Sequence, residues 1–265
     1  MQYRTDANLA ARQSIYVYQH PRIDLPARVL DLAGPQPGAT VADVGCGNGA
    51  YLAELARRRF AGRVVGVDLS PGMLVAARRN VRQARTAASA ASADASTPRA
   101  ADGAALLVAD AAALPLPDGA ADLTLAMHML YHVPDPAAAV RELRRVTRPG
   151  GRVMVVLNSA DHLQELREII RAADGGDAPK PGDRLRLDAG EALLRTVFPS
   201  VTRHDFTGEL LIPDPAPVVD YVRSMSVFLS AADPEQLVAA VLARFPNEPG
   251  RLFRVTTHSG CLVCE

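Results

Sequence analysis

The chain has 265 residues, of which 48% are hydrophobic and 22% charged. These proportions are ordinary for a folded protein and argue against wholesale disorder. Lysine plus arginine and aspartate plus glutamate each number 29, so the formal net charge is zero. A chain-wide electrostatic attraction to nucleic acid or to an anionic membrane is therefore not expected. The length fits one large α/β domain with a small addition.

Cysteine usage and the N-terminal segment indicate a cellular compartment. Three cysteines are too few for a disulfide framework. Residues 1–9 are polar and mixed in charge, unlike a secretory signal. The sequence contains no run near the roughly 20 apolar residues that cross a bilayer. We therefore expect a cytoplasmic protein with no membrane partner.

The first 38 residues read as a helical segment that precedes the main domain. Apolar residues at helical spacing predict a short helix over Asp6–Tyr18. Pro26 suits the first turn of a second helix, and the Gly34–Gly38 segment ends it. We expect residues 1–38 to form a lid and residues 39–265 to form the domain.

Strand and helix patterns alternate through the next 120 or so residues, which favours a parallel sheet with helices on both faces. Low-complexity Ala/Ser sequence over 83–105 is expected to be an insertion. Proline-punctuated helices over 213–246 are expected to form a cap inserted between the two last strands. The expected strands are Thr40–Val44, Arg63–Leu69, Leu106–Val108, Asp122–Met127, Arg152–Leu157, Val201–Ile212 and Leu252–Val263, and two late helices are expected at Asp161–Ala173 and Glu191–Phe198.

A glycine-rich loop lies between the first of these strands and the next helix, in the sequence VADVGCGNG (Val41–Gly49). Glycines let the backbone turn tightly and approach a ligand, and a helix N-terminus offers N–H groups to a carboxylate or phosphate. Gly45, Gly47 and Ala50 also match the dinucleotide form G-x-G-x-x-A. The loop alone therefore leaves a structural turn, a dinucleotide site and another nucleoside site open.

Three acidic residues end three successive predicted strands. Asp43 would repel a pyrophosphate and attract a cationic amine or sulfonium. Asp68 is placed to accept hydrogen bonds from ribose hydroxyls, and Asp110 could accept from an adenine amine. Each alone often serves as a cap or loop carboxylate. Together they favour a nucleoside that carries no pyrophosphate.

These residues give the chain a resemblance to the class I S-adenosylmethionine-dependent methyltransferases, especially small-molecule enzymes of bacterial biosynthesis. The resemblance implies an α/β, Rossmann-like, doubly wound sheet of seven strands, mostly parallel with an antiparallel last strand, to which the helical lid and cap are added. The segments that carry it are Val41–Gly49, Val64–Met73, Val108–Asp118, Asp122–Asp135 and Ala139–Val156.

The same resemblance implies S-adenosyl-L-methionine as cofactor, with no metal. The other loop residues, Cys46 and Asn48, are counted with the cofactor-binding candidates. The implied set places Asp43, Gly45 and Gly47 near the methionine part, Asp68 near the ribose, Asp110 and Ala111 near the adenine, Leu69 and Met73 beside the adenosine, and His128 near the methyl group.

Methyl transfer from a sulfonium needs an aligned acceptor and exclusion of water more than it needs acid–base chemistry. His128 and His132 follow the fourth strand and are candidate catalytic bases, because histidine titrates near neutrality. Alternatively, His128 only lines the cofactor and His132 packs before Pro134. Tyr131 faces either the substrate or the core.

The lid and the cap contain further candidates. Arg12 could bind the methionine carboxylate through two hydrogen bonds, with Tyr18 beside the cofactor and Tyr16 beside the substrate. The alternative is a solvated arginine and tyrosines that pack the helix onto the domain. Tyr221 and Met225 either form an apolar roof over the acceptor or pack their helix on the sheet edge.

The sequence therefore predicts methyl transfer from S-adenosyl-L-methionine to an O, N or C atom of a small molecule in secondary metabolism, leaving S-adenosyl-L-homocysteine. Cys261 and Cys264 have no second cysteine pair for zinc, and in a strand they would face opposite sides. An NAD(P)-dependent oxidoreductase and a non-catalytic cofactor-binding module remain alternatives. No nucleic-acid partner is expected, and the protein is expected to be a monomer or a homodimer.

Overall fold

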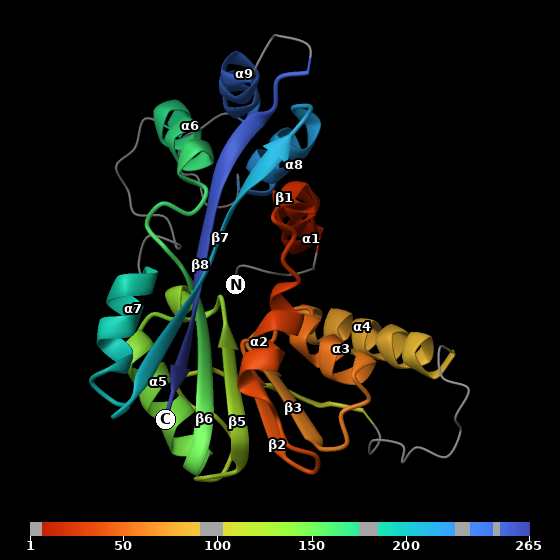
Figure 1. Ribbon diagram of the computed structural model, residues 1–265, viewed down its shortest axis with the longest axis vertical. Coiled ribbons are helices and arrows are strands. Elements are labelled where there is room, and N and C mark those ends of the chain that lie inside the picture. The colour runs from red at the N-terminus through yellow and green to blue at the C-terminus, as the bar shows by residue number, and fades with distance from the viewer. Residues whose placement is uncertain (1–6, 91–102, 175–184, 226–233, 246–249) are drawn as a thin grey trace.

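The computed structural model describes residues 7–90, 103–174, 185–225, 234–245 and 250–265. Figure 1 shows an α/β core at one end and a group of helices at the other, joined by a long two-stranded ribbon. The strands are β1 (Gln19–His20), β2 (Thr40–Val44), β3 (Arg63–Asp68), β4 (Ala105–Val108), β5 (Ala121–Met127), β6 (Thr147–Asn158), β7 (Val201–Ile212) and β8 (Phe253–Cys264).

These strands form one sheet in the order β1-β7-β8-β6-β5-β2-β3-β4. Strands β2 to β6 pair with one another in parallel, whereas β8 is antiparallel to both β6 and β7. The predicted seven strands with an antiparallel last strand are therefore present. The eighth strand, β1, adds only Gln19 and His20 to the outer edge of β7. Two residues carry no periodic pattern, so the sequence did not predict it.

Capping residues mark where several helices begin and end. The side chains of Ser70 and Asp135 accept hydrogen bonds from backbone N–H groups three residues further on, at 3.3 and 2.9 Å. Gly34 ends its helix with a left-handed φ of 52°. The helices are α1 (Ala7–Ser14), η1 (Ile15–Tyr18), α2 (Leu25–Ala33), α3 (Ala50–Arg57), α4 (Pro71–Ala90), η2 (Leu130–His132), α5 (Pro136–Val146), α6 (Gln164–Asp174), α7 (Leu187–Leu194), α8 (Ala216–Met225) and α9 (Pro234–Arg244).

Two late helices begin at other residues than predicted. Helix α6 begins at Gln164 instead of Asp161, because Asp161 and His162 lie in a turn held against β8. Helix α7 begins at Leu187, four residues before the predicted start at Glu191. Leu187 and Leu194 of this helix face the core. The charged residues and Gly190 between them weaken the helical hydrophobic pattern, so the sequence did not predict the first turn.

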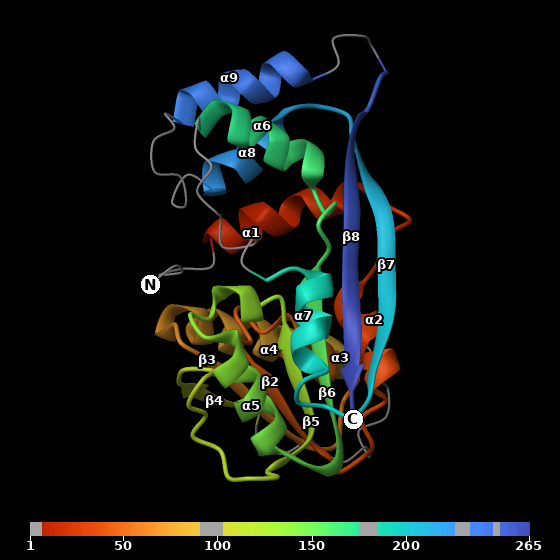
Figure 2. The ribbon, with the colours of Figure 1, turned by 90° about the vertical axis from the view of Figure 1, so that its left-hand side faces the viewer.

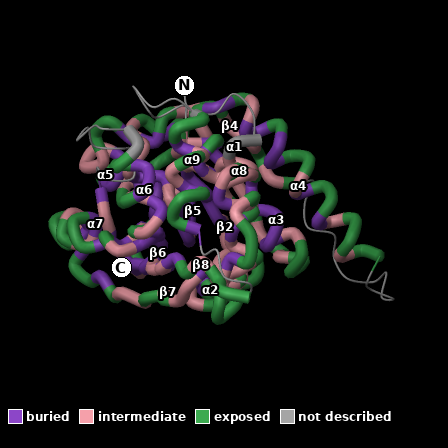
Figure 3. Tube along the Cα trace, turned by 90° about the horizontal axis from the view of Figure 1, so that it is seen from above, coloured by how far each residue is buried: buried purple, intermediate pink, exposed green. Residues whose placement is uncertain are grey.

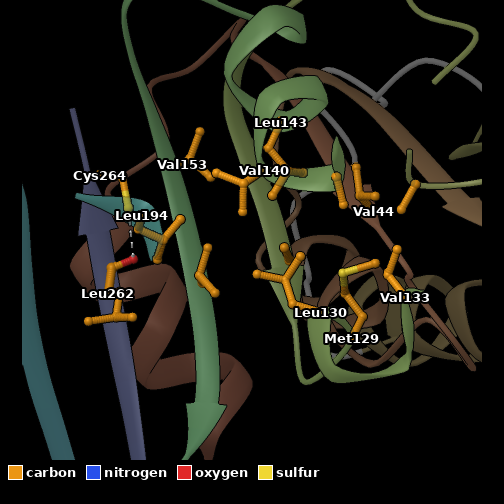
Figure 4. Packing of buried hydrophobic residues seen from close by; sticks show 14 of the residues in the cluster. Val44, Met129, Leu130, Val133, Val140, Leu143, Val153, Leu194, Leu262 and Cys264 are labelled. Atoms are coloured by element: carbon orange, nitrogen blue, oxygen red, sulfur yellow. Dashed lines mark hydrogen bonds between the residues drawn. The ribbon is translucent and has the colours of Figure 1, made fainter. Parts of the chain in front are cut away.

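The sheet is covered on both faces by hydrophobic clusters. One cluster packs α5 and α7 against the sheet, and Figure 4 shows Leu143, Leu194 and Cys264 among its members. The other packs α2 and α3 against the opposite face and contains Cys261. The two cysteines thus belong to opposite faces of the sheet, as their spacing in a strand predicted. Figure 3 shows how the buried residues run through the centre of the molecule.

A third cluster, which we call the cap cluster, lies above the strand ends. It joins η1, α6, α8, α9 and the outer half of the β7–β8 ribbon through Ile15, Leu166, Leu210, Val222 and Leu237, among others. Figure 2 shows α1 between the cap helices and the α/β core. The boundaries 1–38, 39–265, 83–105 and 213–246 stay predictions. Residues 1–6, 91–102, 175–184, 226–233 and 246–249 of these segments lie outside the described residues.

Candidate functional site

The glycine loop that follows β2 needs glycine at two positions for different reasons. Gly45 has a φ of 68°, and a Cβ there would lie 2.7 Å from the Cβ of Met129. Gly47 has a φ of 54°, but a Cβ there would find only Leu9 Cδ2, at 3.8 Å. Gly45 is therefore required by packing and conformation together. Gly47 leaves its side of the loop open to the approach of a ligand.

Asp68, at the end of β3, is bonded to the glycine loop. One carboxylate oxygen accepts from the Gly47 N–H at 2.8 Å, and the other accepts from the Ser70 N–H at 2.8 Å. The N–H groups of Gly45 and Cys46 both donate to the Val67 carbonyl oxygen. The loop is thus fixed to β3. The Asp68 carboxylate keeps lone pairs with which it can accept from ribose hydroxyls.

Asp43 is a buried carboxyl group under the same loop. It is 1% exposed, and neither of its oxygens has a hydrogen-bond partner among the described residues. Burial, with a smaller contribution from Asp68, raises its pKa from 3.8 to about 8. An unpartnered buried carboxyl is costly, so its persistence points to a ligand that supplies a donor or a cation.

The tips of β3 and β4 expose apolar side chains beside the two other acidic residues. Asp68 pairs with Val108 in the sheet, which brings Leu69 next to Val108, and both side chains are 57% exposed. Asp110 is exposed, and its carboxylate accepts from the Ala112 N–H at 2.9 Å. This edge suits a planar ligand with one polar rim.

Two of the adenosine candidates lie deeper than the exposed tips. Ala111 is buried in the core cluster beside this edge. Met73 lies on α4 and is only 2% exposed, so little of its side chain is open to a ligand.

Helix α1 lies over the glycine loop. The Asn48 side chain donates to Gln13 Oε1 at 3.3 Å, and Leu9 faces Gly47. Arg12 is three residues after Leu9 and one before Gln13, so it shares the face of α1 that meets the loop. This position is compatible with the predicted contact between Arg12 and the cofactor carboxylate, which stays a prediction. Tyr16 and Tyr18 pack against the cap cluster, and their contacts with substrate and cofactor stay predictions.

His128 ends β5 in a left-handed conformation with a φ of 54°, and its N–H donates to the Val156 carbonyl oxygen at 3.0 Å. Such a backbone is strained for a non-glycine residue and is common at functional sites. Burial lowers the pKa of its imidazole to about 4. A neutral His128 is a weak base near pH 7, which supports the lining role over the base role.

Tyr131 and His132 follow in η2. Their ring centroids lie 4.5 Å apart at an interplanar angle of 60°. Tyr131 packs against the core cluster, and His132 is half-buried. On the cap side, Tyr221 and Met225 are half-buried on α8.

His162, in the turn before α6, is a buried polar residue that the sequence did not indicate as a site candidate, and it is 6% exposed. Its Nε2 lies 2.9 Å from the Tyr16 hydroxyl oxygen, and its Nδ1 lies 3.1 Å from the His258 backbone nitrogen. Burial, and then the nearby His128, lower its pKa to about 3. Residues 16 and 162 lie far apart in sequence, so no pattern could have paired them.

A hollow of about 450 Å³ lies elsewhere, at the far end of α3 from the glycine loop. Arg58 and Arg59 line it, and Arg58 is already paired with Asp31 and Glu54, at 2.8 and 2.7 Å. Among the described residues, no group of three or more His, Cys, Asp or Glu side chains is placed to hold a metal ion. Within the same residues, every helix is too short or too polar to cross a membrane.

Comparison with known proteins identifies the family. A family model described as a methyltransferase domain matches residues 42–155, which include the glycine loop and all three strand-end aspartates. An uncharacterised methyltransferase of Mycobacterium bovis is 30% identical over 247 residues, which cover 91% of this chain and 86% of that protein. The chain belongs to the S-adenosylmethionine-dependent methyltransferases.

Other relatives match this methyltransferase more narrowly. A malonyl-[acyl-carrier protein] O-methyltransferase of Serratia marcescens is 35% identical over 152 residues, or 57% of this chain and 51% of that protein. Against the first curated relatives, the matched part spans 32% to 51% of their length. The crystal structure of a Bacillus halodurans protein described as a methyltransferase shares the fold, with a TM-score of 0.62, 18% identity, and coverage of 91% of this chain and 98% of that one.

Proposed function

We propose that this methyltransferase moves the methyl group of S-adenosyl-L-methionine to an O, N or C atom of a small molecule and releases S-adenosyl-L-homocysteine. The observation that carries the proposal is Asp43, a buried carboxyl with no partner under a glycine loop. A ligand bearing an ammonium and a sulfonium supplies the missing positive charge. Asp68 and the exposed Leu69 and Val108 support a ribose and an adenine on the same sheet edge.

The loop's own hydrogen bonds argue against the dinucleotide alternative. A phosphate site needs free backbone N–H groups. Here the N–H groups of Gly45, Cys46 and Gly49 donate to backbone carbonyl oxygens, and that of Gly47 donates to Asp68. Asp43 beneath them would also repel a pyrophosphate. An NAD(P)-dependent reaction is therefore the weaker proposal.

The cofactor, when bound, supplies an activated methyl group on a positively charged sulfur. Toward it, Asp68 would accept from the ribose hydroxyls, Asp43 would face the positive charge, and Arg12 would bind the carboxylate. Helix α1 covers the loop and would exclude water from it. The neutral His128 would line the methyl end without taking a proton.

Half-buried tyrosines around the covered strand ends support a small acceptor. The chain's zero net charge gives no support to a nucleic-acid acceptor. A setting in secondary metabolism, a cytoplasmic location and a monomeric or homodimeric state are parts of the same proposal. They are supported by the resemblance to biosynthetic enzymes.

Calorimetric titration with S-adenosyl-L-homocysteine, NAD and NADP tests the cofactor assignment. We expect binding of the first alone. Replacing the Asp68 carboxylate by Asp68→Ala should weaken that binding by roughly 1–3 kcal/mol. Binding of NAD(P) without a response to S-adenosyl-L-homocysteine would overturn the proposal. Mass spectrometry of a phenol, amine and carbon-acid panel then tests turnover, and binding without any methylated product would favour the non-catalytic module.

A further inference from the structure

Tyr16 and His162 form a partly buried polar pair beside the cap cluster. The hydroxyl oxygen of Tyr16 lies 2.9 Å from His162 Nε2, and the two rings stack at 6.3 Å with an interplanar angle of 18°. Tyr16 comes from η1, whereas His162 comes from the turn before α6. The pair therefore joins the N-terminal segment to the base of the cap.

The backbone of β8 determines which nitrogen of His162 carries the proton. The N–H of His258 donates to His162 Nδ1 at 3.1 Å, so Nδ1 must offer a lone pair. His162 is neutral near pH 7, because its pKa is lowered to about 3. A neutral imidazole with a bare Nδ1 carries its hydrogen on Nε2. That hydrogen can only be donated to the Tyr16 oxygen.

Tyr16 therefore accepts from His162 and keeps its own hydroxyl hydrogen for another partner. Among the described residues, the bond to His162 is the one hydrogen bond found for the Tyr16 hydroxyl. A hydroxyl that already accepts a hydrogen bond is a stronger donor. Tyr221 of α8 and Tyr131 of η2 lie near enough to influence the ionisation of Tyr16, and His128 does the same for His162. The hydroxyl thus lies within electrostatic range of aromatic side chains from α8 and η2.

We propose that the Tyr16 hydroxyl, positioned by His162, donates a hydrogen bond to an oxygen atom of the methyl acceptor, and that this acceptor is a phenol-like compound. The inference rests on the proposed function and narrows its substrate class. The aromatic rings of Tyr16, Tyr131 and Tyr221 supply planar apolar surface for the acceptor ring. The hydroxyl hydrogen supplies the single directed polar contact.

The chemistry of the neighbouring groups narrows the class further. Tyr16, His128 and His162 are all neutral near pH 7, and none of them is a good proton acceptor there. None of these three groups would take the proton of the acceptor oxygen, so an acceptor that ionises in water near pH 7 does not depend on them. A donor hydroxyl favours the phenolate form that results. Acidic phenols fit this requirement better than aliphatic alcohols.

Absorbance titration with 4-nitrophenol tests the donor, in the presence of saturating S-adenosyl-L-homocysteine. Tyr16→Phe keeps the ring stack and removes only the hydroxyl. We expect it to bind the probe about tenfold more weakly than the natural protein and to shift less of the bound probe to the phenolate spectrum. Ser14→Ala is the matched control, because it removes a hydroxyl two residues away that bonds only to the Ala11 carbonyl oxygen.

Two substitutions test His162 as a positioning residue. His162→Gln places an amide nitrogen near the former Nε2 and should keep probe binding within about threefold of the natural protein. His162→Asn can still accept from the His258 N–H but cannot reach Tyr16, so it should resemble Tyr16→Phe. Nitrogen-15 NMR should report a bare Nδ1 and a protonated Nε2 for His162.

The outcomes separate the inference from the proposed function. If S-adenosyl-L-homocysteine does not bind the natural protein, the proposed function fails first. If it binds but 4-nitrophenol does not, the acceptor class is wrong. Equal probe binding by Tyr16→Phe and the natural protein, or an equal loss in Ser14→Ala, contradicts the donor role. A protonated Nδ1 on His162 contradicts the positioning role.

Discussion

Alanine substitutions at the two loop glycines, Gly45 and Gly47, distinguish the cost of a steric clash from the cost of a left-handed backbone. Gly45→Ala combines a positive φ with a Cβ 2.7 Å from Met129, so it should cost more than about 2 kcal/mol of unfolding free energy. Gly47→Ala has the same conformational cost but open space, so about 1–2 kcal/mol is expected. Urea unfolding measures both. Equal losses in the two variants would contradict the packing of Met129 against Gly45.

Cofactor binding should release a proton from Asp43. Its pKa of about 8 leaves this carboxyl largely protonated at pH 7 in the free protein. A bound cation would favour the ionised form, so binding near pH 7 should expel a proton and become tighter as the pH rises toward 8. Calorimetry in two buffers that differ in ionisation enthalpy measures this proton.

Asp43→Asn is the matched variant for that measurement. It keeps the shape of the side chain but has no proton to release, so its binding enthalpy should not depend on the buffer.

The raised pKa of Asp43 also determines how the stability of the free protein changes with pH. The folded protein binds more protons than the unfolded chain between pH 3.8 and about 8, so the free protein should lose stability as the pH rises through that range.

At the scale of elements, His258 joins three segments through two carboxylates. Its Nδ1 lies 3.0 Å from an Asp161 oxygen, and its Nε2 lies 2.8 Å from Asp205 on β7. Burial alone would disfavour the charged ring, but the hydrogen bonds to Asp205 and Asp161 outweigh it and raise the pKa of His258. Burial alone would raise the pKa values of Asp161 and Asp205, but their hydrogen bonds outweigh it and lower both values. For Asp205, these bonds include one from Arg203.

These shifts predict a window of pH in which the bridge stabilises the fold. The imidazolium contribution is complete below its unfolded pKa of 6.5 and is lost as the pH rises through the raised folded value. The carboxylate contribution is complete above 3.8 and is lost as the pH falls through the lowered values. His258→Asn should therefore cost most between about pH 4 and pH 6.5.

Solvent screening limits how much unfolding free energy His258→Asn should lose. The side chains of Asp161 and Asp205 are 45% and 40% exposed, so we expect about 1 kcal/mol or less. Urea unfolding of both proteins across the pH range measures it, and added salt should shrink the difference. A difference that grows above neutral pH would show that the ring is neutral in the fold.

The sequence predicted features that depend on neighbours along the chain. Pro26 lies in the first turn of α2 and Gly34 ends that helix, as expected. Asp43, Asp68 and Asp110 lie at successive strand ends of one sheet edge. Short-range chemistry and parallel topology are enough for such predictions. The bonds that Asp68 makes to the glycine loop depend on side-chain geometry, which no pattern specifies.

Features that depend on three-dimensional contact were missed. Strand β1 exists only because β7 offers it an edge, and its two residues have no signal of their own. His162 falls within the predicted helix Asp161–Ala173, and its pairing depends on Tyr16, more than a hundred residues away. Long-range pairs of this kind appear only once the cap is folded over the core.

At the scale of the whole molecule, the cap cluster and the core clusters contain different side chains. Leu237 of α9 is fully buried in the cap cluster, and Leu143 of α5 is fully buried in the core. Truncating either to alanine should remove about 2–5 kcal/mol of local packing. The two losses fall on different parts of the molecule, so they should affect different functions.

Leu237→Ala should loosen the helices that hold Tyr221 and the turn of His162, while the glycine loop and α3 keep their packing. We expect faster hydrogen exchange confined to α6, α8 and α9, an acceptor KM raised severalfold, and an unchanged Kd for S-adenosyl-L-homocysteine. Leu143→Ala should lower the melting temperature of the α/β core and speed exchange in α5 and β5 instead. If Leu237→Ala weakened cofactor binding as much as acceptor binding, cap and core would form a single cooperative unit, and the separation of the two binding sites proposed here would be wrong.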